Sequence, residues 1–133
     1  MLETELGELC PVVMDPSQPG GWGSRTAAHF ELSELGRRSL LTKLADTQEE
    51  NQEVWEDLPG FQWYAPVLRA KPGCEVLAVH KDISNEQGRV PLLVTRTYGA
   101  GKVLFMGTDG AWRWRKGVED KYHYRFWGQV VRW

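Results

Sequence analysis

Residues 98–115 read YGAGKVLFMGTDGAWRWR, and this segment is the most informative part of the chain about its fold. Residues 99–101, GAG, form a short connection whose glycines can adopt positive φ, as a tight turn between antiparallel strands requires. Residues 103–106, VLFM, are apolar at successive positions, so both faces of a strand built from them are apolar. The strand over 102–107 is therefore predicted to be covered on both faces, at the centre of a sheet.

Further strands are predicted on the N-terminal side of this segment. Alternating or β-rich patterns predict strands at 27–33, 63–70, 74–80 and 92–98, the last pairing with 102–107 as a hairpin. Pro66 interrupts one of these strands and indicates an edge or a bulge, because proline cannot donate a ladder hydrogen bond. Loops are expected at 15–24 and 81–89, and the acid-rich residues 45–60 are expected to be a solvated connector with one helical turn around Trp55.

The C-terminal residues 121–133 predict an amphipathic helix. At about 100° per residue one broad arc of the helix is aromatic or aliphatic, with His123 inside it. Its members are Tyr122, Tyr124, Phe126, Trp127, Val130, Val131 and Trp133. So wide an arc predicts a helix that packs against a sheet and a second element.

The length, charge and composition of the chain limit the kinds of protein to which it can belong. The 133 residues suit a single domain, 1–133, and the net charge of −2 comes from intermixed acids and bases. This excludes a general nucleic-acid binder, and no apolar run approaches the roughly 18 residues that direct membrane insertion needs. Cys10 and Cys74 match no metal or haem spacing, so they are either free thiols or one long-range disulfide, and we favour free, buried thiols.

No catalytic or cofactor motif stands out. The chain contains no G-x-S-x-G elbow or cysteine counterpart, and its three histidines, His29, His80 and His123, lack metal-site spacing. The glycines before Lys102 lack the third glycine of a dinucleotide fingerprint and the Ser or Thr of a phosphate loop. We therefore predict no metal and no cofactor, and we lean away from an enzyme.

The loop after the predicted central strand is the candidate site. Ligands of open α/β sheets bind beyond strand ends, and this loop offers polar and aromatic groups for a polar or anionic ligand. The candidate residues are Thr108, Asp109, Trp112, Arg113, Trp114, Arg115 and, on the following helix, His123. The alternative, which we favour for the loop, is structural: Asp109 caps a turn, the arginines stack on indoles or pair with acids at 119–120, and the tryptophans seal the sheet.

Several blocks carry a family resemblance: ELGELCPVV (5–13), LPGFQWYAPVLRA (58–70), KPGCEVLA (71–78), PLLVTRTYGAGKVLFMGTD (91–109), AWRWR (111–115) and YRFWGQVVRW (124–133). Together they resemble the C-terminal half of the glutamine-amidotransferase-like domains of large bacterial proteins, many of them membrane-associated with von Willebrand A-type segments. The resemblance implies the later part of a flavodoxin-like α/β domain. As an isolated unit it is expected to be α+β, with a mixed, largely antiparallel sheet and the C-terminal helix.

The resemblance carries over no catalytic residue, because the Cys, His and Glu that glutaminases use are not found in matching positions. It implies a non-catalytic module with an interaction or ligand-sensing role, whose partner is the remainder of a larger polypeptide, another protein or a second copy of the chain. The compartment stays open, a soluble segment of a membrane-associated bacterial protein included. Two alternatives remain: a carbohydrate-binding module that uses Trp22, Trp112 and Trp114, and a residual hydrolase that uses Asp109 and His123.

Overall fold

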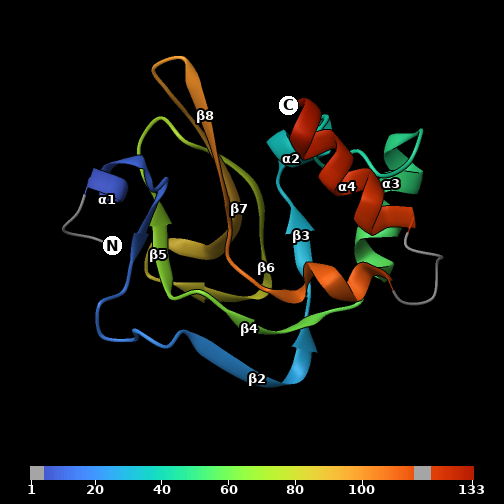
Figure 1. Cartoon of the computed structure of the whole chain (residues 1–133). Coiled ribbons are helices and arrows are strands. Elements are labelled where there is room, and N and C mark those ends of the chain that lie inside the picture. The colour runs from blue at the N-terminus through green and yellow to red at the C-terminus, as the bar shows by residue number, and fades with distance from the viewer. Residues whose placement is uncertain (1–4, 116–120) are drawn as a thin grey trace.

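The structure, a computed structural model, describes residues 5–115 and 121–133, and over these residues every strand pair is antiparallel (Figure 1). The largest sheet has the order β3-β6-β7-β8, built from β3 (Phe30–Leu32), β6 (Glu75–Asn85), β7 (Gly88–Tyr98) and β8 (Gly101–Met106). Two smaller sheets pair β1 (Val12–Met14) with β5 (Val67–Ala70) and β2 (Trp22–Ala28) with β4 (Phe61–Tyr64).

The helices divide between two sides of this arrangement. On one side of the largest sheet lie α2 (Glu34–Arg38), α3 (Gln48–Asp57) and α4 (Lys121–Arg132), whereas α1 (Glu5–Leu9) lies beside β1 and β5 (Figure 1). Local sequence explains where α2 and α3 begin. Ser33 and Thr47 are N-caps whose hydroxyl oxygens accept the amide N–H groups of Gly36 and Glu50, at 2.9 and 3.2 Å.

The prediction of a flavodoxin-like α/β fold is wrong: the chain is a β-rich α+β fold. Parallel strands need long crossover connections, usually helical, between neighbours in the sheet. Here β6 and β7 are joined by residues 86–87, and β7 and β8 by residues 99–100, which leaves room only for hairpin turns. Gly99 adopts a φ of +58°, the left-handed conformation that a tight hairpin turn needs.

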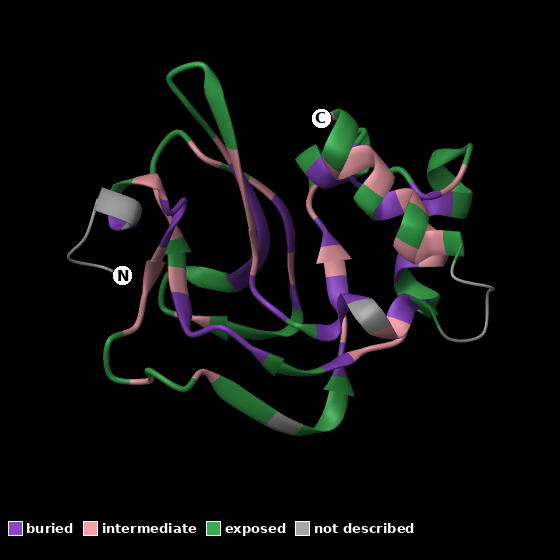
Figure 2. Cartoon of the chain, viewed as in Figure 1, coloured by how far each residue is buried: buried purple, intermediate pink, exposed green. Residues whose placement is uncertain are grey.

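The placement of the strand over 102–107 at the sheet centre is also wrong. β8 is an edge strand, and its apolar residues 103–106 are half-buried. The interior strands are β6 and β7, and residues 90–95 of β7 are buried (Figure 2). Residues 81–89, expected to be a loop, instead extend β6 and β7 as an exposed hairpin, which explains their polar character.

The core centres on a cluster of aromatic rings that joins the large sheet to the helices. Phe30 contacts Phe61, Trp55 and Trp114 edge-on, with ring centroids 5.1, 5.7 and 6.0 Å apart. Phe126 of α4 completes the cluster at 5.2 Å from Trp114. Such edge-to-face pairs add to the stability that burial provides.

The structure describes the state of both cysteines and the lengths of the helices. Cys10 is buried, Cys74 is half-buried, and both are free thiols. Of the helices that the structure describes, none is long and apolar enough to span a membrane.

Candidate functional site

The loop that the sequence singles out is packed against the body of the protein. The 3-10 helix η1 (Gly110–Arg115) follows β8, and the Thr108 hydroxyl, itself buried, accepts the Gly110 amide at 3.1 Å. A Cβ atom on Gly110 would lie 2.7 Å from the Cβ of Phe61, so η1 and β4 approach closely. His123 links η1 to the C-terminal helix α4, because its Nδ1 lies 3.1 Å from the carbonyl oxygen of Ala111.

The predicted ligand residues do not all face one space. Trp114 is only 1% exposed and lies in the aromatic core, whereas Asp109 and Arg115 are exposed. Arg113 reaches Gln62 Oε1 at 3.5 Å, near the limit for a hydrogen bond. The side chain of Trp112 and the acids at 119–120 lie outside the described residues. Ligand binding by residues 108–115 therefore stays a prediction, and Trp114 has the position of a core residue.

The carbohydrate platform and the hydrolase pair also stay predictions. Trp22 lies on β2, where it pairs with Tyr64 of β4. Trp63 is exposed as well, but it pairs with Gly23, the neighbour of Trp22, so the two indoles start from opposite faces of the ribbon. No hydrogen bond between Asp109 and His123 is found among the residues described.

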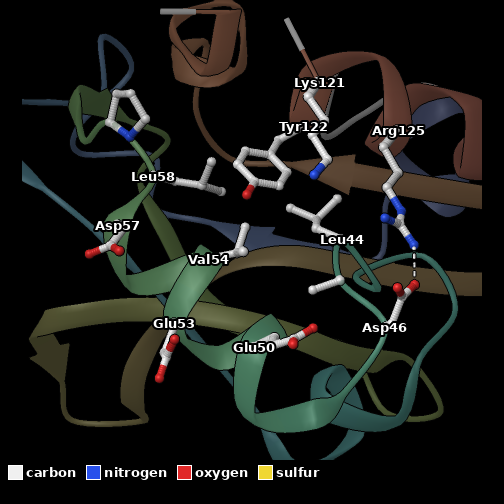
Figure 3. A pocket seen from close by; sticks show the side chains of 12 residues that line it. Leu44, Asp46, Glu50, Glu53, Val54, Asp57, Leu58, Lys121, Tyr122 and Arg125 are labelled. Atoms are coloured by element: carbon white, nitrogen blue, oxygen red, sulfur yellow. Dashed lines mark hydrogen bonds and ion pairs between the residues drawn. The ribbon is translucent and has the colours of Figure 1, made fainter. Parts of the chain in front are cut away.

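A cavity of about 600 Å³ opens between α3 and α4 (Figure 3). Its apolar surface comes from Leu44, Val54 and Leu58, with the Tyr122 ring beside them. The remaining lining residues are mostly charged: Ala45, Asp46, Glu50, Glu53, Asp57, Pro59, Lys121 and Arg125. The volume falls within the range of roughly 300–1,000 Å³ that is common for small-molecule sites.

The acidic wall of the cavity follows from the spacing of α3. Glu50, Glu53 and Asp57 stand at i, i+3 and i+7, so they share one face of the helix. All three are exposed, and no ion pair of theirs is found among the residues that the structure describes. The helix turns its other face to the core, where Trp55 donates its indole N–H to the carbonyl oxygen of Thr42 at 2.8 Å.

The opposite wall carries cations from α4. The Arg125 guanidinium lies 3.5 Å from the Asp46 carboxylate, and the Lys121 ammonium lies 5.5 Å from the centre of the Tyr122 ring (Figure 3). The Asp46 side chain is largely exposed, so this ion pair contributes at most about 1 kcal/mol. Four carboxylates against two cations leave the lining with a formal charge of −2.

The loop that closes one side of the cavity is held in place by hydrogen bonds from α3 and α4. Asn51 Oδ1 accepts the amide N–H of Leu44 at 2.7 Å, and both residues are buried. From α4, Gln129 Nε2 donates to the carbonyl oxygen of Lys43 at 2.5 Å. Because its backbone is fixed from two helices, this wall of the cavity is preformed.

Sequence reasoning missed this cavity because it treated residues 45–60 as a solvated connector. The signal that could have found α3 is a capping box, in which Thr47 is followed three residues later by Glu50. A helix that begins there places the acids on one face and Trp55 on another. Nothing in the sequence shows that α4 lies opposite, since that depends on tertiary packing.

A buried imidazole lies outside both regions, where the pairing of β6 with β7 shifts register after Val79. The ring of His80 lies between Tyr64 and Phe61, with centroids 4.9 and 5.7 Å away. Its Nδ1 accepts the backbone N–H groups of Asp82 and Ile83, at 3.1 and 3.0 Å. The imidazole therefore stabilises a bulge whose amides lack a regular strand partner.

Burial lowers the pKa of His80 below its usual value of 6.5, and it outweighs the opposing effect of the Asp82 carboxylate, while His29 lowers the pKa further. Protonation at Nδ1 would also break both hydrogen bonds with the bulge. We assign His80 a structural role. No group of three or more metal-binding side chains occurs among the described residues.

Comparison with known proteins gives one informative likeness. No protein-family model and no curated protein matches the chain. Among solved structures, the cytoplasmic protein STM3548 from Salmonella typhimurium is similar, with a TM-score of 0.68 and 17% sequence identity over 98% of this chain and 45% of that one. The chain therefore spans less than half the length of this neighbour. At such low identity the likeness supports the β-rich α+β fold and shows nothing about activity.

Proposed function

We propose that this chain is a non-catalytic, ligand-sensing module of a larger bacterial protein, and that the cavity between α3 and α4 binds a small organic cation with an apolar part. The observation that carries the proposal is the lining of this cavity. It combines an apolar surface with carboxylates that have no ion-pair partner among the described residues and with an excess of negative charge. The non-catalytic part of the proposal rests on the sequence, in which no nucleophile elbow occurs.

The recognition chemistry has two parts. The ammonium group of a ligand would be attracted to Glu50, Glu53 and Asp57, and a partly enclosed site strengthens this attraction relative to open water. An aliphatic or aromatic body would cover Leu44, Val54 and Leu58, gaining about 25 cal/mol for each Å² of apolar surface removed from water. Primary amines with an alkyl chain or ring, such as tyramine or cadaverine, fit this description.

Membership of a larger protein is supported by two observations. The structural neighbour is more than twice as long as the part that this chain matches. The aromatic blocks of the sequence also resemble domains of large bacterial proteins, and descent from the glutamine-amidotransferase-like group stays part of the proposal. The partner would then be the rest of such a polypeptide or a protein that responds to the ligand.

Calorimetric titration with amines and, separately, with carboxylates of matched size tests the proposal. We expect saturable binding of tyramine or cadaverine and none of the carboxylates. The variant Glu53→Gln/Asp57→Asn should weaken amine binding at least tenfold, about 1.4 kcal/mol. The control is Glu49→Gln, which removes an exposed acid from the same helix outside the cavity lining. Absence of binding, or equal loss in the control, would refute the proposal.

A further inference from the structure

The edge strand β8 has the composition of an interior strand. Its residues 103–106 are apolar on both faces, although they are only half-buried. Edge strands in soluble proteins are usually short, charged or covered, because an open apolar edge pairs readily with another strand. Within the described part of the chain, no strand pairs with the outer edge of β8.

The pattern of hydrogen bonds between β7 and β8 shows which backbone groups of β8 point toward its open edge. The Gly107 amide donates to the carbonyl of Leu92 at 2.7 Å, and the register pairs Met106 with Leu93. Hydrogen-bonded and non-hydrogen-bonded pairs alternate along an antiparallel ladder. Lys102, Leu104 and Met106 therefore direct their N–H and C=O groups away from β7, toward the open edge.

The C-terminal end of α4 reaches this strand, and an apolar stripe runs along the helix. Tyr124, Trp127 and Val131 are 63%, 38% and 86% exposed, and their spacing of three and four residues places them on one side of the helix. That side is about 100° from Lys121 and Arg125, so it points away from the cavity with α3. The end of α4 is tied to β8, because Lys102 Nζ donates to the carbonyl oxygen of Trp133 at 2.8 Å.

We infer that a second copy of this chain pairs with β8 in antiparallel orientation, about a two-fold axis at Leu104. In this register Leu104 lies opposite its own copy, and Lys102 lies opposite Met106 of the second copy. All three outward-directed residues then form ladder hydrogen bonds, about six in total. Lys102 is the only charged residue of β8, so no like charges meet across the new pair.

The size of the surface sets the expected strength. The three exposed side chains of α4 present roughly 350 Å² per protomer, on typical areas for such residues. A standard interface buries about 800 Å² per partner, so the β8 side chains and backbone must supply the remainder. We therefore expect a dimer of micromolar stability, which extends the four-stranded sheet to eight strands. This inference does not depend on the ligand proposed for the cavity.

Light scattering coupled to size exclusion tests the dimer. At high micromolar concentration the unmodified chain is expected to have twice its chain mass of 15.2 kDa. The variant Tyr124→Asp/Val131→Asp places charge on side chains that are already exposed, so it should fold and return the mass to 15.2 kDa. Leu35→Asp, which changes an exposed leucine on α2, is the matched control and should leave the dimer intact.

Cross-linking tests the register. Leu104→Cys in a Cys74→Ser background should form a disulfide-linked dimer on mild oxidation, because facing residues on the axis lie about 5.5 Å apart between Cα atoms. Ile83→Cys, at an exposed site on β6, is the control and should not cross-link. A monomeric native chain, a dimer that survives Tyr124→Asp/Val131→Asp, or a Leu104→Cys chain that does not cross-link would each overturn the inference.

Discussion

Replacing Trp114 with alanine separates a structural role of the aromatic loop from a ligand-binding one. Trp114 is 1% exposed and contacts three rings, those of Phe126, Trp55 and Phe30, at centroid distances of 5.2, 5.5 and 6.0 Å. Truncating a buried aromatic side chain typically destabilises a protein by about 3–5 kcal/mol, because the surroundings fill the cavity only in part. Total stability of a domain is about 5–15 kcal/mol, so this is a large fraction.

The assay is urea unfolding followed by far-UV circular dichroism, since removal of an indole changes the fluorescence itself. We expect Trp114→Ala to lower the free energy of unfolding by about 3–5 kcal/mol and the melting temperature by roughly 10–20 °C. The control is Trp63→Ala, because Trp63 is 39% exposed and donates one hydrogen bond to the Gly20 carbonyl. Loss of this hydrogen bond should lower the free energy of unfolding by about 1 kcal/mol. If Trp114→Ala costs no more than Trp63→Ala, Trp114 is not a core residue and the argument fails.

Two further predictions concern the packing of α2 and the buried imidazole. A Cβ atom at Gly36 would lie 1.9 Å from the Leu77 carbonyl oxygen, so Gly36→Ala should destabilise the chain by about 2–3 kcal/mol in urea unfolding. Gly20→Ala, with nothing within 4 Å of the added atom, should have little effect, and equal losses would contradict this account. The folded-state pKa of His80 is lowered, so the unfolded chain binds more protons below pH 6.5 than the folded chain does. The free energy of unfolding should therefore decrease as the pH is lowered from 6.5, by up to about 1.4 kcal/mol per pH unit. His80→Gln should flatten this slope between pH 6.5 and the lowered pKa, and an unchanged slope would show that other groups cause it.

Local patterns in the sequence predicted local structure well. The glycines at 99–101 indicated the hairpin, and β7 and β8 pair around it in the expected order. The same pattern misplaced β8, because successive apolar residues show only that both faces of a strand avoid water. They do not show whether a neighbouring strand lies on each side. If a second copy covers the edge, the apolar character of β8 has the same physical cause as that of an interior strand.

The topology could not be read from the sequence for a related reason. Whether hairpin-connected strands join one sheet or several depends on which faces the helices cover, and that is a tertiary property. The resemblance to glutamine-amidotransferase-like domains implied a flavodoxin-like α/β domain. The parallel strands of such a domain are ruled out for β6, β7 and β8 by the short β6–β7 and β7–β8 connections. Connection length is visible in the sequence at 99–101, where three residues leave room only for an antiparallel turn.

The candidate site shows how one helix can serve both the core and a ligand. The inner face of α3 fixes the helix through the Trp55 indole, which donates to the Thr42 carbonyl within the aromatic core. Its outer face carries Glu53 and Asp57 on a backbone whose position the core has already determined. A ligand that binds these carboxylates therefore meets a preformed wall and need not order it, which reduces the entropic cost of binding. The 3-10 helix η1 packs against α4, and Trp114 contacts Trp55 of α3 and Phe126 of α4, so this indole helps to hold the two walls of the cavity in place.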